Sequence, residues 1–130
     1  MLHLYCWADY ISPELIEKFE KENDCKVIID TFDSNEALLA KLQAGASGYD
    51  IIFPSHYVVE MLANAGNLQK LNHSKITVWN FLDKNVIAQL PDKDCQYSIP
   101  YMMSYTGIGY VKDEVKDFKP SWRNVQQCNS

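Results

Sequence analysis

The chain has 130 residues, a mass of 15.0 kDa and a formal net charge of −5, from 12 basic and 17 acidic side chains. This length fits one domain and is too short for two full ones. Hydrophobic residues make up 47% and charged residues 22%, which excludes a disordered chain. No apolar run approaches the roughly 20 residues that span a bilayer, and the acidic excess without basic clusters argues against a nucleic-acid surface.

The first third of the sequence predicts a strand, a helix and a second strand. Residues 2–7 form the first strand, although the alternation is imperfect. Ser12 is a natural N-cap and Pro13 suits the first helical position, so a helix follows that ends near Asn23. Residues 26–32 are rich in β-branched side chains and predict the second strand.

Two more helices and a third strand follow with short connections. Residues 33–36 form a capping-box pattern with Asp33 in the capping position, and Gly45 ends the helix that they open. Residues 49–53 predict a short strand with a continuous apolar centre, as expected where helices cover both faces of a sheet. The third helix ends at Gly66. This alternation predicts an α/β fold, an open parallel (mixed) sheet with helices on both faces.

Beyond residue 66 the pattern is weaker. Several apolar residues are expected to add to the core on short helices: Trp79, Phe81, Leu82, Ile87 and Leu90. Residues 96–99 and 106–111 are expected to be strands. Residues 121–130 resemble a helix start, capped by Ser121, that stops before it can bury much, which indicates truncation. We therefore expect a domain over residues 1–110 and the start of a further part over residues 111–130.

The four cysteines allow three disulfide pairings. Cys6 and Cys25 would lie at opposite ends of parallel strands, about 15 Å apart, whereas a disulfide allows roughly 7 Å between Cα atoms. The sequence has no CxxC and no Cys/His spacing typical of zinc, so buried or incidental thiols and no metal are expected. No basic and apolar leader precedes residue 2, so we expect no signal peptide in this sequence.

Ligands of open parallel sheets bind beyond the carboxyl ends of the strands. There the predicted fold places two loops, Trp7-Ala8-Asp9-Tyr10 and Pro54-Ser55-His56-Tyr57. Neither contains glycine, which disfavours a phosphate site. Aromatic faces beside a carboxylate suit an organic cation, since cation–π contacts contribute roughly 0.5–2 kcal/mol.

Each of these residues also has a purely structural interpretation. Trp7 and Tyr10 could pack over the first helix, Asp9 could be a solvated loop acid, and Ser55 could serve only as an N-cap. An enzyme would need a reactive Cys6 or a site built on His56. Because no GxSxG elbow anchors such a site, the sequence favours binding over catalysis.

Four motifs occur in order: residues 4–13 (LYCWADYISP), residues 32–36 (FDSNE), residues 49–55 (YDIIFPS), and residues 99–101 with 106–110 (IPY and TGIGY). Together they resemble the N-terminal part of the spermidine/putrescine substrate-binding proteins that serve ATP-driven polyamine importers. The resemblance runs from about residue 2 to about residue 122.

The resemblance implies the first lobe of a two-lobed, type II-like periplasmic binding protein, without a cofactor, that works with a membrane permease. It implies that Trp7 and Tyr10 help to box the methylene chain of a polyamine and that Asp9 and Ser55 face an ammonium group. It also implies that Tyr57 borders the site. Half of the box would belong to a second lobe that these residues do not include.

Some residues depart from the family pattern. Ala8 replaces a common hydroxyl residue, Met103 stands where Trp is frequent, and Cys6 stands where Asn is frequent. Without the rest of the protein, we expect an uncovered edge or apolar face that promotes a homodimer or an exchange of segments. A polyamine-sensing or interaction module without a transport role is the alternative function.

Overall fold

The computed structural model describes residues 1–92, 94–115 and 121. By its internal contacts the chain divides into two units, residues 1–100 and residues 101–130. The first unit contains the sheet, the helices and the hydrophobic core.

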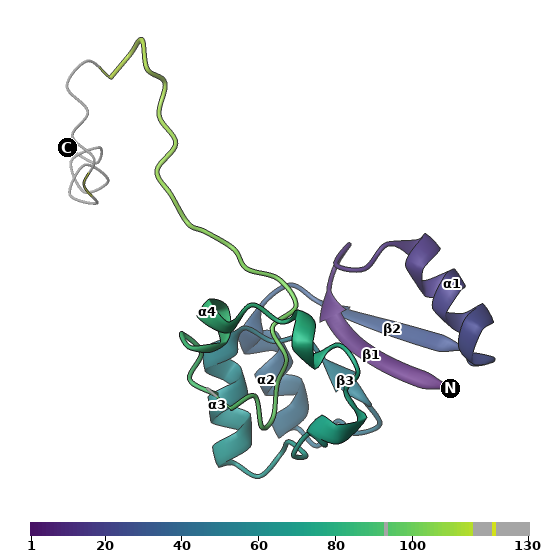
Figure 1. Cartoon of the computed structure of the whole chain (residues 1–130). Helices are drawn as coiled ribbons and strands as arrows, with labels where there is room; N and C mark the ends of the chain where they lie inside the picture. Colours follow the sequence, from purple (N-terminus) through teal and green to yellow (C-terminus); the bar gives the residue numbers. More distant parts are fainter. Residues whose placement is uncertain (93, 116–120, 122–130) are drawn as a thin grey trace. The chain divides into compact units, whose positions relative to one another are not determined.

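A three-stranded parallel sheet forms the centre of the first unit. β1 (Leu2–Trp7) lies between β2 (Val27–Phe32) and β3 (Ile51–Ile52), in the order β2-β1-β3 (Figure 1). The register pairs Trp7 with Phe32 and Tyr5 with Ile52. The parallel sheet is therefore confirmed.

β3 is shorter than the five residues predicted for it. The Asp50 backbone N–H donates to the His3 carbonyl over 2.9 Å, and the Phe53 N–H donates to the Tyr5 carbonyl over 2.9 Å. These two bonds continue the contact with β1 on either side of Ile51–Ile52. Residues 50–53 thus run beside β1 as predicted, although only Ile51 and Ile52 form regular strand.

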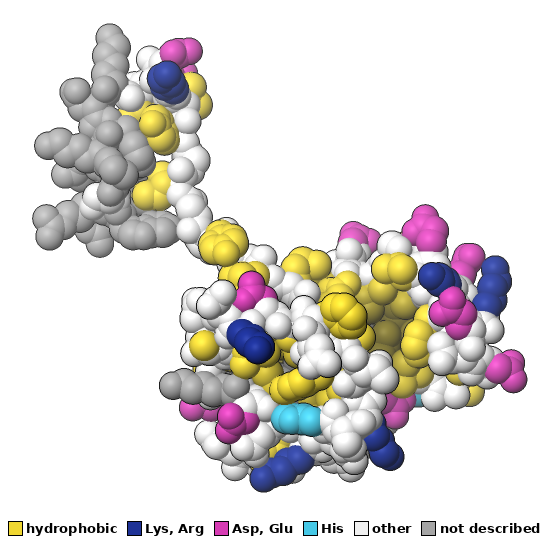
Figure 2. Space-filling model, in the orientation of Figure 1, with side chains coloured by type: hydrophobic (Ala, Val, Ile, Leu, Met, Phe, Trp, Pro, Cys, Tyr) yellow, Lys and Arg dark blue, Asp and Glu magenta, His cyan; other side chains and the backbone are white. Residues whose placement is uncertain are grey.

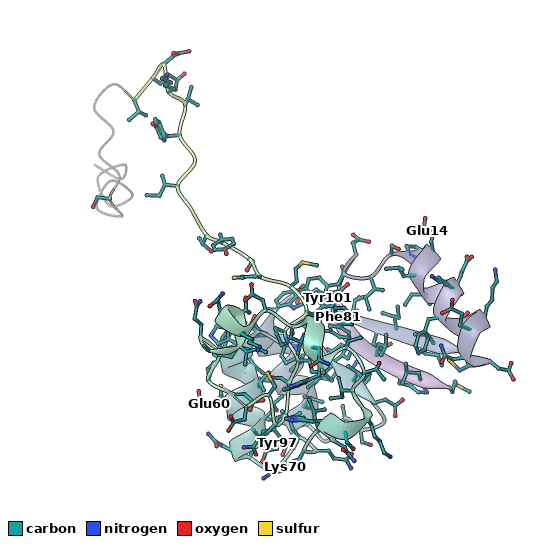
Figure 3. All side chains as sticks on the ribbon, viewed as in Figure 1. Glu14, Glu60, Lys70, Phe81, Tyr97 and Tyr101 are labelled. Carbon is teal, nitrogen blue, oxygen red and sulfur yellow. The ribbon has the colours of Figure 1, made fainter. Side chains whose placement is uncertain are left out.

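Helix α1 (Pro13–Asn23) begins and ends as predicted. The Ser12 hydroxyl accepts a bond from the Leu15 N–H, and Pro13 occupies the first turn. Asp24 ends the helix in a left-handed backbone conformation. The helix contributes no buried residue, and Glu14 on its first turn points away from the sheet (Figure 3).

Helix α2 (Asn35–Gln43) is capped by Ser34 and not by Asp33, so the predicted capping residue was wrong by one position. The Ser34 hydroxyl accepts the Ala37 N–H at 3.1 Å. An N-cap side chain accepts from an amide two or three residues further along the chain, and the Ala37 amide lies three residues after Ser34. Helix α3 (His56–Asn64) follows Ser55.

The core lies between the sheet and the helices α2 and α3, which lie together on one side of the strands (Figure 1). Five buried residues form it: Tyr5, Phe32, Leu38, Val58 and Leu62. Leu4 and Cys6 alternate with Tyr5 along β1, so they point to its other face, where they are also buried. Helix α1 lies on that side of the sheet (Figure 1). Helices therefore cover both faces, as expected.

The α1 side of the sheet remains partly open. Leu15 and Phe19 of α1 are 58% and 42% exposed, and Ile51 of β3 is 47% exposed. Figure 2 shows apolar side chains gathered beside α1, whose outer surface is charged. A helix that buries none of its apolar stripe leaves surface that another chain segment can cover.

After α3 the chain forms η1 (His73–Lys75), η2 (Trp79–Phe81) and α4 (Lys84–Ile87), so short helices are confirmed here. The expected contribution to the core is wrong. Trp79, Leu82, Ile87 and Leu90 are only half-buried, and Phe81 is 86% exposed.

Residues 96–99 are not a strand, which contradicts the prediction. The Asp92 carboxylate accepts the backbone N–H groups of Gln96, Tyr97 and Ser98 at 2.8–3.0 Å. These amides are therefore used in a turn and are not available to a sheet. Beside this turn the Lys70 ammonium lies 5.9 Å from the Tyr97 ring centroid (Figure 3).

In the second unit the structure describes residues 101–115 and 121, and residues 106–111 carry no strand, so that prediction is also wrong. The helix expected over residues 121–130 lies outside the described residues, Ser121 apart, and a domain boundary at residue 110 stays a prediction. Cys6, Cys25 and Cys95 are free thiols, so no bond joins Cys6 to Cys25. Within the described ranges, no helix has both the length and the apolar character needed to cross a membrane.

Asp30 connects β2 with α2 and with the residues before β3. Its Oδ2 accepts the Tyr49 hydroxyl at 2.6 Å and the Lys41 ammonium at 3.3 Å. The Lys41 ammonium lies 4.6 Å from the centroid of the Tyr5 ring, which stacks on Tyr49. The bond from Tyr49, and then that from Lys41, lowers the pKa of the Asp30 carboxyl.

Truncation of the buried core should destabilise the chain strongly. Leu38 has no exposed surface, so Leu38→Ala removes a fully packed side chain and should lower the free energy of unfolding by about 2–5 kcal/mol. Urea unfolding followed by circular dichroism measures this loss. Leu15→Ala on the exposed side of α1 is the matched control and should lower the free energy of unfolding far less. Equal losses in the two variants would contradict the described core.

The Asp30 cluster should make stability depend on pH. The native pKa of Asp30 is lowered, so its contribution is fully present above the ordinary value of about 3.9 and is lost as the pH falls through the native pKa. The difference in unfolding free energy between the parent chain and Asp30→Asn should therefore be constant near neutral pH and shrink below about pH 4. Glu17→Gln, at an exposed position of α1, is the control. A difference that grows on acidification would refute this role.

Candidate ligand-binding rim

The carboxyl ends of the three strands lie at one edge of the sheet, because all three run in the same direction. We call the residues at this edge the rim: residues 7–10 at the end of β1, residues 32–35 at the end of β2 and residues 53–57 after β3. The predicted site residues Trp7, Asp9, Tyr10, Ser55 and Tyr57 all belong to it. The sheet thus brings together the two loops that the sequence singles out.

Three contacts connect the segments of the rim. The ring centroids of Trp7 and Phe32 lie 4.6 Å apart, which ties the end of β1 to the end of β2. The Tyr10 and Phe53 rings meet edge to face at 6.2 Å, which ties the loop after β1 to the end of β3. Bonds between Asn35 and Ser55 tie the segment after β2 to the start of α3.

Asp9 lies where the chain turns from β1 towards α1. Its φ of +55° is in the left-handed region, which few residues other than glycine adopt without cost. Asp and Asn tolerate this conformation better than other side chains because they can bond to the local backbone. The carboxylate is exposed and can accept from a ligand cation.

Ser55 holds the N-cap position of α3 but makes no side-chain cap bond. Its hydroxyl oxygen accepts the Asn35 side-chain N–H over 2.9 Å, and its backbone N–H donates to the Asn35 side-chain oxygen over 3.0 Å. Ser55 is half-buried and Asn35 is 8% exposed. Ser55 therefore holds the N-cap position that the sequence predicts, but its hydroxyl bonds to another segment and not to the first turn of α3.

Tyr57 lies on the first turn of α3 and is 45% exposed. Its ring meets the exposed His56 ring edge to face, with centroids 6.4 Å apart. Both side chains face solvent at the border of the rim.

The residues that an enzyme would need have other properties. Cys6 is 2% exposed, and burial raises the pKa of its thiol. A cysteine nucleophile requires the opposite, an accessible thiol with a lowered pKa. Among the described residues, no group of three or more His, Cys, Asp or Glu side chains could hold a metal ion.

A hollow of about 550 Å³ lies elsewhere, at the amino end of β3. Leu42, Tyr49, Asp50 and Leu68 are among its lining residues. Two of its polar groups already have partners: the Tyr49 hydroxyl donates to Asp30, and the Asp50 carboxylate accepts the His3 N–H at 2.8 Å. The rim keeps an exposed carboxylate beside aromatic rings, so it is the better candidate for a cation.

Asn35 is a rim residue that the sequence interpretation missed. Residues 33–36 predict the start of a helix and residues 32–36 are one of the four motifs of the family resemblance, but Asn35 itself was not predicted as a site residue. The signal was its position, directly beyond the carboxyl end of the second strand, where polar side chains tend to face a ligand. It is the buried polar residue of the described core.

Comparison with known proteins identifies the class. Residues 8–127 match the model of the bacterial extracellular solute-binding protein family, and the chain belongs to this family. The chain is 46% identical over 118 residues to the putrescine-binding periplasmic protein SpuD of Pseudomonas aeruginosa, covering 89% of this chain and 32% of that protein. It is 44% identical over 117 residues to the putrescine-binding periplasmic protein PotF of Escherichia coli, covering 88% and 32%.

Solved structures agree with the fold. The Tp0655 (TpPotD) lipoprotein of Treponema pallidum matches with a TM-score of 0.84 and 37% identity, over 93% of this chain and 38% of that one. A putative spermidine/putrescine ABC transporter protein of Listeria monocytogenes matches with a TM-score of 0.73 and 44% identity, over 77% and 31%. The chain therefore spans about a third of the length of the curated relatives that it matches.

Proposed function

We propose that this chain is the first lobe of a polyamine-binding protein of an ABC importer, and that its rim contributes half of the ligand site. The observation that carries the proposal is the convergence of an exposed carboxylate, two aromatic side chains and a hydroxyl at the carboxyl edge of one sheet. The names of the relatives, which are putrescine-binding and spermidine/putrescine-binding periplasmic proteins, support it.

Each rim residue has a defined part in this proposal. Trp7 and Tyr10 border the methylene chain and offer ring faces to the cation. Asp9 accepts from one ammonium group in a charge-assisted bond, and Ser55 accepts from the same group. Tyr57 borders the site, where half of its surface can still be covered by a ligand or a second lobe.

The role is capture and not catalysis, which agrees with a buried thiol at Cys6 and with a family of solute-binding proteins. We place the whole protein in the periplasm, where it would deliver a polyamine to a membrane permease. Putrescine and spermidine are both candidates, since the relatives are named for both.

A dicationic diamine needs a carboxylate for each end, and the rim offers Asp9 for one of them. Each missing charge-assisted bond costs about 1.5–3 kcal/mol, so the 130 residues alone should bind putrescine only in the millimolar range or more weakly. Asp9→Asn keeps a side chain that tolerates the left-handed backbone while it removes the charge, and should weaken binding about 10- to 150-fold. An NMR titration with putrescine measures both constants.

Two controls separate specific from general effects in this titration. Glu60→Gln removes an exposed charge from α3 (Figure 3) and should leave the binding constant unchanged. Asp9→Ala should weaken binding and also lower the melting temperature, because alanine is strained at φ +55°. A micromolar constant for the chain alone, or an unchanged constant in Asp9→Asn, would contradict the proposed half-site.

We also propose that the chain by itself forms a homodimer or an oligomer with exchanged segments. The half-exposed apolar side chains of α1 and Ile51 support this, since such surface associates when nothing covers it. Light scattering on a concentrated solution should give at least twice the 15.0 kDa monomer mass. Leu15→Glu together with Phe19→Glu should reduce the mass towards that of the monomer. A monomer mass for the unmodified chain at high concentration would refute the association.

A further inference from the structure

Ser55 is bonded in an unusual way for a residue in its position. Its backbone has the extended N-cap conformation, φ −66° and ψ 153°, and the N–H groups of Val58 and Val59 bond to its carbonyl. A serine at this position ordinarily bonds with its hydroxyl to an amide of the first turn, as Ser12 and Ser34 do in α1 and α2. The Ser55 hydroxyl makes no such bond.

Asn35 accounts for this difference. It is the first residue of α2, is 8% exposed, and meets Ser55 through both polar atoms of its side chain. The Ser55 backbone N–H can only donate, so the atom facing it must be the Asn35 amide oxygen. The Asn35 NH₂ group therefore faces the Ser55 hydroxyl oxygen, at 2.9 Å, and must be the donor in that bond.

This polarity fixes what Ser55 can offer to a ligand. A hydroxyl oxygen has two lone pairs and one proton. One lone pair receives the Asn35 N–H, which leaves the second lone pair to accept from an ammonium group. If Ser55 instead capped α3, the same oxygen would be drawn to the helix amides and away from the other segments of the rim.

We infer that Asn35 is a positioning residue of the rim: it withholds the Ser55 hydroxyl from the cap of α3 and holds its oxygen as an acceptor for an alkylammonium group. Asn35 need not contact the ligand for this role. The inference rests on the proposed function, since it assigns how one residue of that site is oriented.

A double-mutant cycle tests the inference. The four proteins are the parent chain, Asn35→Ala, Ser55→Ala and the double variant, each titrated with putrescine by NMR. Ser55→Ala should weaken binding about tenfold, as expected for loss of one bond to a charged group. Asn35→Ala should weaken putrescine binding by nearly the same factor. The double variant should bind no more weakly than Ser55→Ala alone, since both substitutions act through the Ser55 hydroxyl. The inference would be overturned if the loss of affinity in the double variant equals the product of the losses in the two single variants. It would also be overturned if Asn35→Ala binds putrescine as tightly as the parent chain.

A second readout needs no ligand and is insensitive to a general loss of stability. In Asn35→Ala the Ser55 side chain should rotate to cap α3, which changes its χ1 couplings and protects a first-turn amide of α3 from hydrogen exchange. In Asn35→Ala with Ser55→Ala this extra protection should disappear. An unchanged Ser55 rotamer in folded Asn35→Ala would refute the positioning role.

The two readouts separate this inference from the proposed function. If the parent chain binds putrescine at the rim but the cycle is additive, the function stands and the role of Asn35 fails. If the putrescine shifts of the parent chain lie outside the rim, the proposed function loses its support, and the Ser55 rotamer alone decides the role of Asn35.

Discussion

The parallel pairing of β1 with both of its neighbours is the constraint on which the rest of the structure depends. Because β1 lies between β2 and β3 and all three strands point the same way, their carboxyl ends meet at one edge. Residues that are 48 positions apart in the chain, such as Trp7 and Ser55, then belong to the same rim. Pairing in the opposite direction would place the two loops at opposite ends of the sheet.

Side-chain contacts then give the rim its local order. Aromatic pairs join Trp7 to Phe32 and Tyr10 to Phe53, while the two bonds of Asn35 join α2 to the start of α3. Each contact joins different segments, so the rim is held from three directions. Asp9 and Asp33 are the exposed acidic groups of this edge, and Asp9 lies in the same loop as Trp7 and Tyr10.

The sequence predicted the elements whose signals are local. Ser12 and Pro13 mark the start of α1, and the β-branched run before Phe32 marks β2, because capping and strand propensity act over a few residues. Predictions failed where distant or competing contacts decide. The Asp92 carboxylate captures the amides that residues 96–99 would need for a strand.

The candidate site shows the same division. The loops after β1 and β3 could be placed at one rim from periodicity alone, since strand direction follows from short helical connections. The part played by Asn35 could not, because it depends on a bond across 20 residues that redirects a serine from its ordinary capping role. Helix-cap patterns describe local bonds only, and a side chain can satisfy a cap pattern while bonding elsewhere.

The central claim is that the rim, and no other surface of the chain, receives the alkyl chain of a polyamine. Intermolecular nuclear Overhauser effects between the putrescine methylene protons and the protein measure this contact directly. The account predicts effects to the Trp7 indole and the Tyr10 ring. Effects confined to the hollow at the amino end of β3, on Tyr49 and Leu68, would contradict it.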